Sequence, residues 1–173
     1  CWKDPQLFNL LAAIPDRVIE HHEYWRLITA IGVHADLRHF FSNMLFLIFF
    51  SYLLYGYLGS WVYPILVAIC GGLTNYFSLL TYTEPIRLVG ASGIIYVMAS
   101  FWLVLYVLVQ RTRSLPKRVM HVIGIGVLVL VPTNLSPAVS YRTHAIGFVI
   151  GAICAAGYFQ IKKTQIRLME SIE

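Results

Sequence analysis

Long apolar stretches separated by short polar segments dominate the pattern of hydrophobic positions along this chain. The five stretches lie at about 37–57, 61–82, 91–110, 118–131 and 143–161. A helix of about 20 apolar residues spans a bilayer, so the stretches predict transmembrane helices, although the fourth is short. We expect an all-α, polytopic bundle with five spans.

The segment before the first span mixes apolar and polar positions. Its apolar run, from Leu7 to Ile14, is too short to cross a bilayer, and charged and histidine side chains follow it. Tyr24 and Trp25 then form an aromatic pair of the kind that favours the membrane–water interface. We expect short helices that lie on the membrane surface.

Composition agrees with a membrane protein. Of the 173 residues, 58% are hydrophobic and 12% are charged, and the mean hydropathy is +0.70. A soluble domain of this length needs far more polar surface. Cys1, Cys70 and Cys154 lack the spacing of a metal site, so we expect neither a metal nor a cofactor.

The placement of positive charge predicts the orientation of the chain, whose net charge is +5. Basic residues crowd the turn after the third span and follow the last span: Arg111, Arg113, Lys117, Arg118, Lys162, Lys163 and Arg167. Such an excess is typical of cytoplasmic segments, so we expect both basic segments to lie on the cytoplasmic side. Because membrane orientation accounts for the positive charge, we expect membrane lipid, and not nucleic acid, as a partner. A single domain would then comprise an outer interfacial loop (1–35), a helical bundle (36–162) and a cytoplasmic tail (163–173).

A serine between glycines lies where a loop becomes the third span, in the sequence Gly90-Ala91-Ser92-Gly93. A serine at a helix start is usually a cap, and this motif alone is weak. However, glycines permit close approach of another backbone, and the helix N-terminus offers N–H groups to a developing oxyanion. Capping and catalysis both remain open for this serine taken alone.

The last span opens with His144, and Gly147 and Gly151 follow on the same helical face. The glycines by themselves indicate tight helix packing. An ionisable residue at the end of such a groove is a functional candidate. Ser92 and His144 begin spans that run in the same direction, so we expect both at one membrane depth.

His39 and Asn43 share one face of the first span, where they are either a polar pair between helices or donors to an oxyanion at Ser92. No acidic residue lies within any span, which favours a Ser–His dyad over a triad. Tyr96, one turn after Ser92, could hold the imidazole by ring packing.

In this order and spacing, the motifs resemble those of the rhomboid intramembrane serine proteases, from about Tyr24 to the last span. The matching motifs are Trp25-Arg26, His39-x-x-x-Asn43, Gly90-x-Ser92-Gly93 and His144-x-x-Gly147-x-x-x-Gly151. The resemblance implies that Ser92 attacks and that His144 is general base, then acid. It implies an oxyanion hole formed by His39, Asn43 and the Ser92 N–H. It also implies that Tyr96 stacks on His144, that His34 supports the first loop, and that substrates are single-span membrane proteins.

The chain also departs from the family pattern. The rhomboid core has six spans, so we expect that the first one is missing before Cys1, and Ala30 replaces a histidine that holds water in many bacterial members. We expect a bacterial inner-membrane protein whose site opens to the outer face. The alternatives are a catalytically silent rhomboid-like protein that binds transmembrane helices and a channel or small transporter, which the lack of mid-span ionisable residues disfavours.

Overall fold

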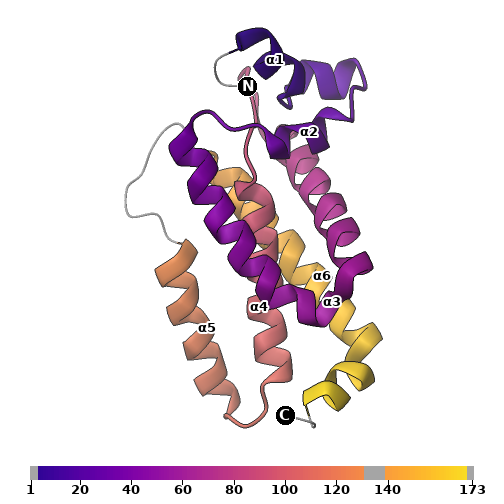
Figure 1. Ribbon diagram of the computed structural model, residues 1–173, viewed down its shortest axis with the longest axis vertical. Coiled ribbons are helices and arrows are strands. Elements are labelled where there is room, and N and C mark those ends of the chain that lie inside the picture. The colour runs from indigo at the N-terminus through magenta and orange to yellow at the C-terminus, as the bar shows by residue number, and fades with distance from the viewer. Residues whose placement is uncertain (1–3, 131–138, 171–173) are drawn as a thin grey trace.

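The computed structural model describes residues 4–130 and 139–170, and these ranges are largely helical (Figure 1). The N-terminal region contains the α-helices α1 (Pro5–Leu11) and α2 (Arg26–Gly32) with the π-helix η1 (Asp16–Glu20) between them. The longer helices are α3 (Leu37–Leu79), α4 (Ser92–Val109), α5 (Leu115–Leu130) and α6 (Tyr141–Glu170). Within the described ranges no strand forms, and the predicted all-α class is confirmed.

The chain reverses within α3, at Gly59. This residue has φ +72° and ψ 176°, a backbone conformation that L side chains rarely adopt, so glycine permits the turn. The two arms of α3 lie as separate rods in Figure 1, and a 2.5 Å contact between the Ser51 and Tyr63 hydroxyls joins them. The arms correspond to the first and second predicted spans.

Among the described helices, α3, α4 and α6 are long and apolar enough to cross a membrane. Because α3 has two arms, these helices contain four of the five predicted spans. The remaining helix, α5, has 16 residues and is about 24 Å long, less than the roughly 30 Å of a hydrocarbon core. The end predicted for this span at residue 131, together with Cys1 and residues 171–173, lies outside the described residues.

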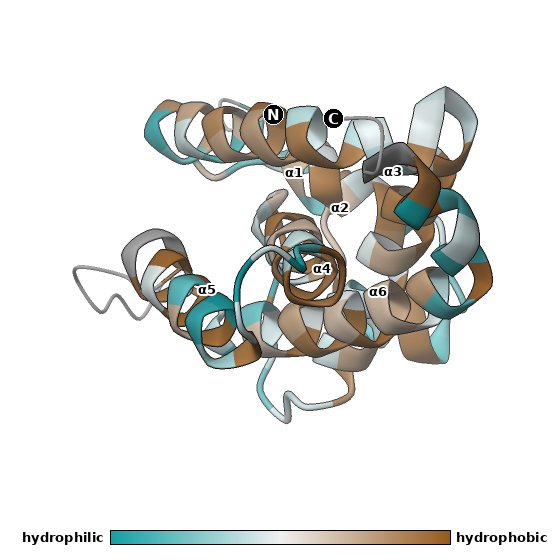
Figure 2. Cartoon of the chain, turned by 90° about the horizontal axis from the view of Figure 1, so that it is seen from below, coloured by the Kyte–Doolittle hydropathy of each residue, from teal (hydrophilic) through white to brown (hydrophobic). Residues whose placement is uncertain are grey.

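The bundle is built around α4, which Figure 2 shows between α3, α5 and α6. Most of α4 is buried, including Met98, Phe101 and Leu105. A helix that is apolar on all sides belongs inside a bundle or in lipid, and its backbone groups are satisfied internally. This central position explains why both arms of α3 and the α6 helix can present side chains to the start of α4.

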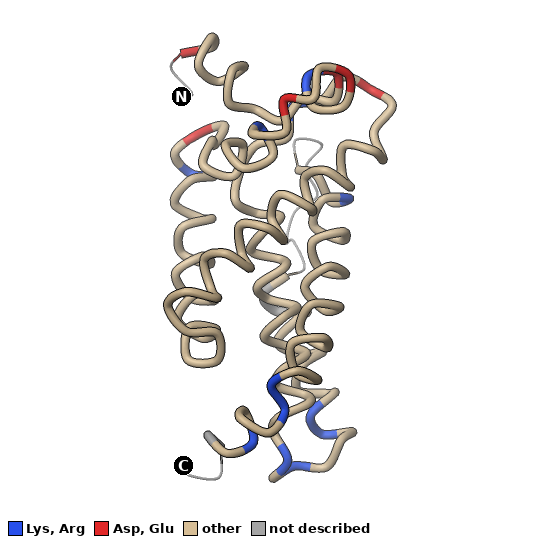
Figure 3. Tube along the Cα trace, turned by 90° about the vertical axis from the view of Figure 1, so that its right-hand side faces the viewer, with Lys and Arg blue, Asp and Glu red and all other residues tan. Residues whose placement is uncertain are grey.

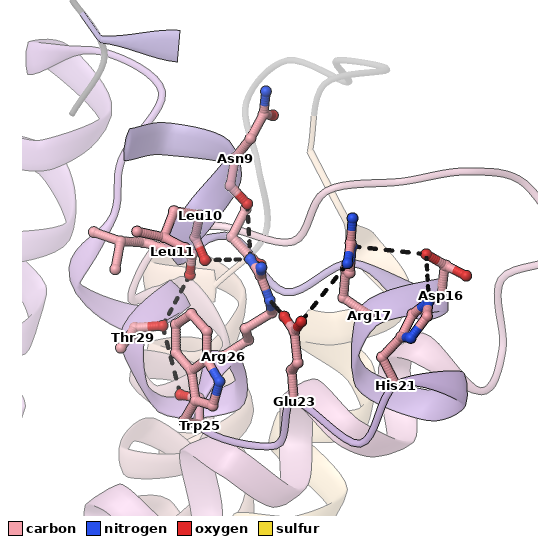
Figure 4. A network of polar contacts seen from close by, with 11 residues as sticks. Asn9, Leu10, Leu11, Asp16, Arg17, His21, Glu23, Trp25, Arg26 and Thr29 are labelled. Atoms are coloured by element: carbon pink, nitrogen blue, oxygen red, sulfur yellow. Dashed lines mark hydrogen bonds and ion pairs between the residues drawn. The ribbon is translucent and has the colours of Figure 1, made fainter. Parts of the chain in front are cut away.

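The N-terminal region is held together by Arg26 (Figure 4), a residue that is only 5% exposed. Its guanidinium donates to the carbonyls of Asn9 (2.7 Å) and Leu10 and to the Glu23 carboxylate, and it lies 4.7 Å from the centre of the Trp25 ring. The hydrogen bond from Arg26 to the Glu23 carboxylate lowers the pKa of the Glu23 carboxyl. The Trp25-Arg26 pair therefore organises the loop and does not reach the start of α4.

Basic residues lie at both ends of the bundle, but the acidic residues coloured in Figure 3 lie at one end. Lysine and arginine gather where α4 turns into α5 and along the last turns of α6, whereas the acidic residues of 4–84 lie at the other end. α6 continues to Glu170. Residues 163–170, predicted as the start of a tail, are therefore part of this helix.

Candidate active site

The predicted serine is the first residue of α4 and is half-buried. Ala91 occupies the cap position, and no side chain caps this helix. Gly90 has φ +104°, a left-handed conformation that glycine adopts readily. The capping explanation for Ser92 is therefore wrong, because the turn before it places this residue inside the helix.

The turn before Ser92 is held by the N-terminal region. The Gly90 N–H donates to the Ala30 carbonyl (2.9 Å), and the Ala91 N–H donates to His34 Nε2 (3.4 Å). His34 Nδ1 in turn lies 3.3 Å from the Gly32 carbonyl, which fits the tautomer with its proton on Nδ1. His34 thus supports the serine turn directly.

His39 and Asn43 pack against the same turn. A Cβ atom placed on Gly90 would lie 2.8 Å from His39 Cε1, 3.0 Å from His39 Nε2 and 3.3 Å from Asn43 Nδ2. Glycine is therefore required for this approach. Asn43 Nδ2 is buried and has no hydrogen-bond partner among the described residues. A buried donor of this kind calls for an explanation, and a developing oxyanion is one.

The glycine face of α6 lies directly on α4. A Cβ atom on Gly147 would lie 2.5 Å from the Gly93 carbonyl oxygen, and one on Gly151 would overlap the Val97 carbonyl. No side chain fits at either position. The structure thus brings the first turn of α6 beside the first turn of α4, where the sequence placed Ser92 and His144 at one depth.

His144 is half-buried and stacks on Tyr96, with ring centroids 4.2 Å apart and planes 10° from parallel. Tyr96 is itself anchored, because its hydroxyl donates to the Leu130 carbonyl (2.6 Å). None of the hydrogen bonds within 4–130 and 139–170 joins the Ser92 hydroxyl to the imidazole. Such bonds often tighten only when substrate binds, so the proton-transfer contact stays a prediction.

An open apolar pocket of about 630 Å³ lies beside the imidazole, between α4, α5 and α6. Tyr96, Tyr141 and His144 line one part of it, and the rest is almost entirely aliphatic or aromatic. The sequence pattern did not reveal this pocket. A span with apolar residues on every face gives no indication of which face packs against a neighbouring helix and which face stays open. Thr74 and Thr143, which pack against Gly93, were also missed.

The burial of His34 predicts a dependence of stability on pH. Burial lowers the pKa of this imidazole from its ordinary value of about 6.5. As the pH falls below about 6.5, the unfolded chain binds a proton at this position before the folded chain does, so stability falls until the pH reaches the folded pKa. We expect the Tm of the wild type to drop more between pH 7.5 and 5.5 than that of His34→Gln, measured in detergent. Equal drops would contradict this role of His34.

The geometry agrees with a comparison against known protein families. A family model described as the Rhomboid domain matches residues 21–161, from the loop that holds the serine turn to the middle of α6. A comparison with proteins of curated function gives no match. Because the matched segment covers most of the chain and includes α3, α4, α5 and the larger part of α6, the chain belongs to the rhomboid family of integral membrane proteins.

Proposed function

We propose that this protein is a serine endopeptidase that cleaves peptide bonds of transmembrane proteins, with Ser92 as nucleophile and His144 as its base. The observation that carries the proposal is the convergence at the start of α4. There, Gly90 is packed against His39 and Asn43 of α3, and Gly93 against the first turn of α6. Capping does not account for Ser92, and helix packing alone does not require polar groups from three helices at one point.

In the proposed reaction, Ser92 Oγ attacks the scissile carbonyl and its proton passes to the His144 imidazole. The proton then goes to the leaving amine, and water, activated by the same imidazole, hydrolyses the acyl-enzyme. The oxyanion would accept hydrogen bonds from the Ser92 N–H, His39 and Asn43 Nδ2. Asn43 Nδ2, which is buried and has no hydrogen-bond partner among the described residues, supports this role, since negative charge that develops nearby would give it a partner.

We propose that the substrate is a membrane-spanning segment. The apolar pocket beside His144 supports this, because it suits a chain segment that arrives from lipid. The basic residues at the end away from Ser92 favour an orientation with that end in the cytoplasm and the site open to the outer face, in a bacterial inner membrane. We propose that a single domain comprises an outer interfacial loop, a helical bundle and a cytoplasmic end.

A serine-reactive fluorophosphonate probe tests the proposal. We expect the wild type in detergent to be labelled and Ser92→Ala to remain unlabelled, because the probe traps an activated hydroxyl. Ser100→Ala is the matched control: this buried serine of α4 donates to the Val97 carbonyl and lies two turns from the site. Labelling of Ser92→Ala at the wild-type level would refute the assignment.

The competing function is a catalytically silent rhomboid-like protein that binds transmembrane helices. The observation that favours it is that no hydrogen bond within residues 4–130 and 139–170 joins Ser92 Oγ to the His144 imidazole, because a nucleophile needs its base within reach. The same labelling experiment separates the two functions. A wild type that folds, binds a single-span peptide and is never labelled would establish the silent form.

A further inference from the structure

Among the described residues, no hydrogen bond to the imidazole ring secures the position of His144. Nδ1 is buried and has no hydrogen-bond partner in the described part of the chain. The sequence also holds no acidic residue between Glu84 and Glu170 that could orient the ring as a triad aspartate does. The ring is oriented by stacking against Tyr96, by an edge contact with Tyr141 (ring centroids 6.2 Å apart) and by the backbone of α6. Contacts that fix the first turn of α6 therefore also fix the position of His144, the proposed base.

Ser140, the residue before α6, holds this first turn. Its Oγ accepts a hydrogen bond from the Thr143 N–H (3.3 Å) and lies 2.5 Å from Thr143 Oγ1, while its carbonyl accepts from the His144 N–H (3.2 Å). A serine in this arrangement satisfies N–H groups that a helix start leaves unpaired. Ser140 is thus hydrogen-bonded to His144 and to Thr143, the residue before it.

Tyr82 connects this cap to α3. Its hydroxyl lies 2.5 Å from Ser140 Oγ, and it follows the end of α3 by three residues. Arg142 adds a second link, because its Nη1 donates to the Thr81 carbonyl (2.7 Å) and its guanidinium lies 5.0 Å from the centre of the Tyr82 ring. Tyr82 also packs against the buried apolar cluster of the N-terminal region, whose members are Ala13, Val18, Leu27, Ala30, Leu79 and Leu88. The start of α6 is therefore tied to a packed part of the molecule.

One arrangement of protons satisfies these hydroxyls together. Tyr82 Oη–H donates to Ser140 Oγ, and Ser140 Oγ–H donates to Thr143 Oγ1, so the serine hydroxyl uses its one donor and both acceptor positions. The methyl group of Thr143 packs on Gly93, where a Cβ atom would lie 3.0 Å from it. The contacts thus run continuously from the end of α3 to the residue beside Ser92.

We propose that Tyr82, Ser140 and Thr143 form a positioning relay that sets the place of His144 relative to Ser92. The inference rests on the proposed function, since it assigns these hydroxyls to the alignment of that dyad. A displacement of about 1 Å at a reacting group costs roughly a hundredfold in rate. Removal of one hydroxyl shifts the helix start by less, so we expect about a tenfold loss in the maximal rate with substrate affinity unchanged.

The test measures fluorophosphonate labelling of the full chain in detergent as a maximal rate, kinact, and a half-saturating probe concentration, KI. We expect Tyr82→Phe and Ser140→Ala to lower kinact about tenfold with KI unchanged. Ser140→Thr keeps the hydroxyl and should stay within about twofold of the wild type. Tyr76→Phe is the matched control, because this ring packs on the same cluster and its hydroxyl makes no hydrogen bond within the described ranges.

Hydrogen–deuterium exchange of the segment 139–147 supplies a second readout that does not depend on catalysis. Faster exchange in Tyr82→Phe, with wild-type exchange in Tyr76→Phe, is the expected result. Wild-type kinact and exchange in Tyr82→Phe, or equal losses in Tyr76→Phe, would overturn the relay. If the wild type is never labelled, the proposed function fails by itself, and unchanged exchange in Tyr82→Phe would then overturn the relay separately.

Discussion

Replacement of His144 by alanine is expected to lower the turnover of a single-span model substrate at least about a thousandfold, with little change in substrate affinity. The imidazole is the base that we propose for Ser92, and it is stacked on Tyr96 at the end of the glycine face. Loss of a dyad member typically removes several orders of magnitude, and what remains comes from the oxyanion site and substrate binding. The rate is measured in detergent at pH 7.5, where wild-type folding can be verified.

The chain contains a matched control for this change. His121 of α5 also stacks on a tyrosine, Tyr106, with ring centroids 5.5 Å apart, but it lies at the basic end of the bundle. His121→Ala should leave turnover within about twofold of the wild type. If the proposed dyad acts as a unit, Ser92→Ala combined with His144→Ala should be no slower than either single variant. Additive losses would contradict a shared role.

Gly151→Ala is expected to lower the free energy of unfolding by roughly 2 kcal/mol, the typical cost of overpacking a close contact. A methyl group there would meet the Val97 carbonyl and the Ser100 hydroxyl, both on α4. The Val97 carbonyl belongs to the backbone, so it can move away only if the helix shifts. Because α6 carries His144, displacement of this helix should also cost the Gly151→Ala variant most of its proposed proteolytic activity. Thermal unfolding in detergent and probe labelling measure the two effects.

Gly157 of the same helix provides the control, because a Cβ atom added there would have nothing within 4 Å. Gly157→Ala should be neutral or stabilising by up to about 1 kcal/mol, since alanine favours a helix more than glycine does. If Gly157→Ala and Gly151→Ala destabilised the protein equally, the loss would come from glycine-specific flexibility and the packing explanation would be wrong.

Several features could be predicted from local sequence because they depend on spacing along one helix. Apolar length predicted the helical membrane fold, and the offsets of His144, Gly147 and Gly151 predicted one packed face. The stacking of Tyr96 on His144, expected from ring packing, is present. Ser92 at a helix start was also visible, although its alternative role as a cap could not be dismissed without the backbone of Ala91.

The sequence alone thus determined which residues could carry chemistry and which helix each belongs to. Only the tertiary structure decided how those helices are rotated and tied together, through the turn at Gly90 held by Ala30 and His34 and the contact of the Tyr82 hydroxyl with Ser140. The physical reason is that spans that are apolar on every face leave their rotation unspecified, so contacts between distant segments set it.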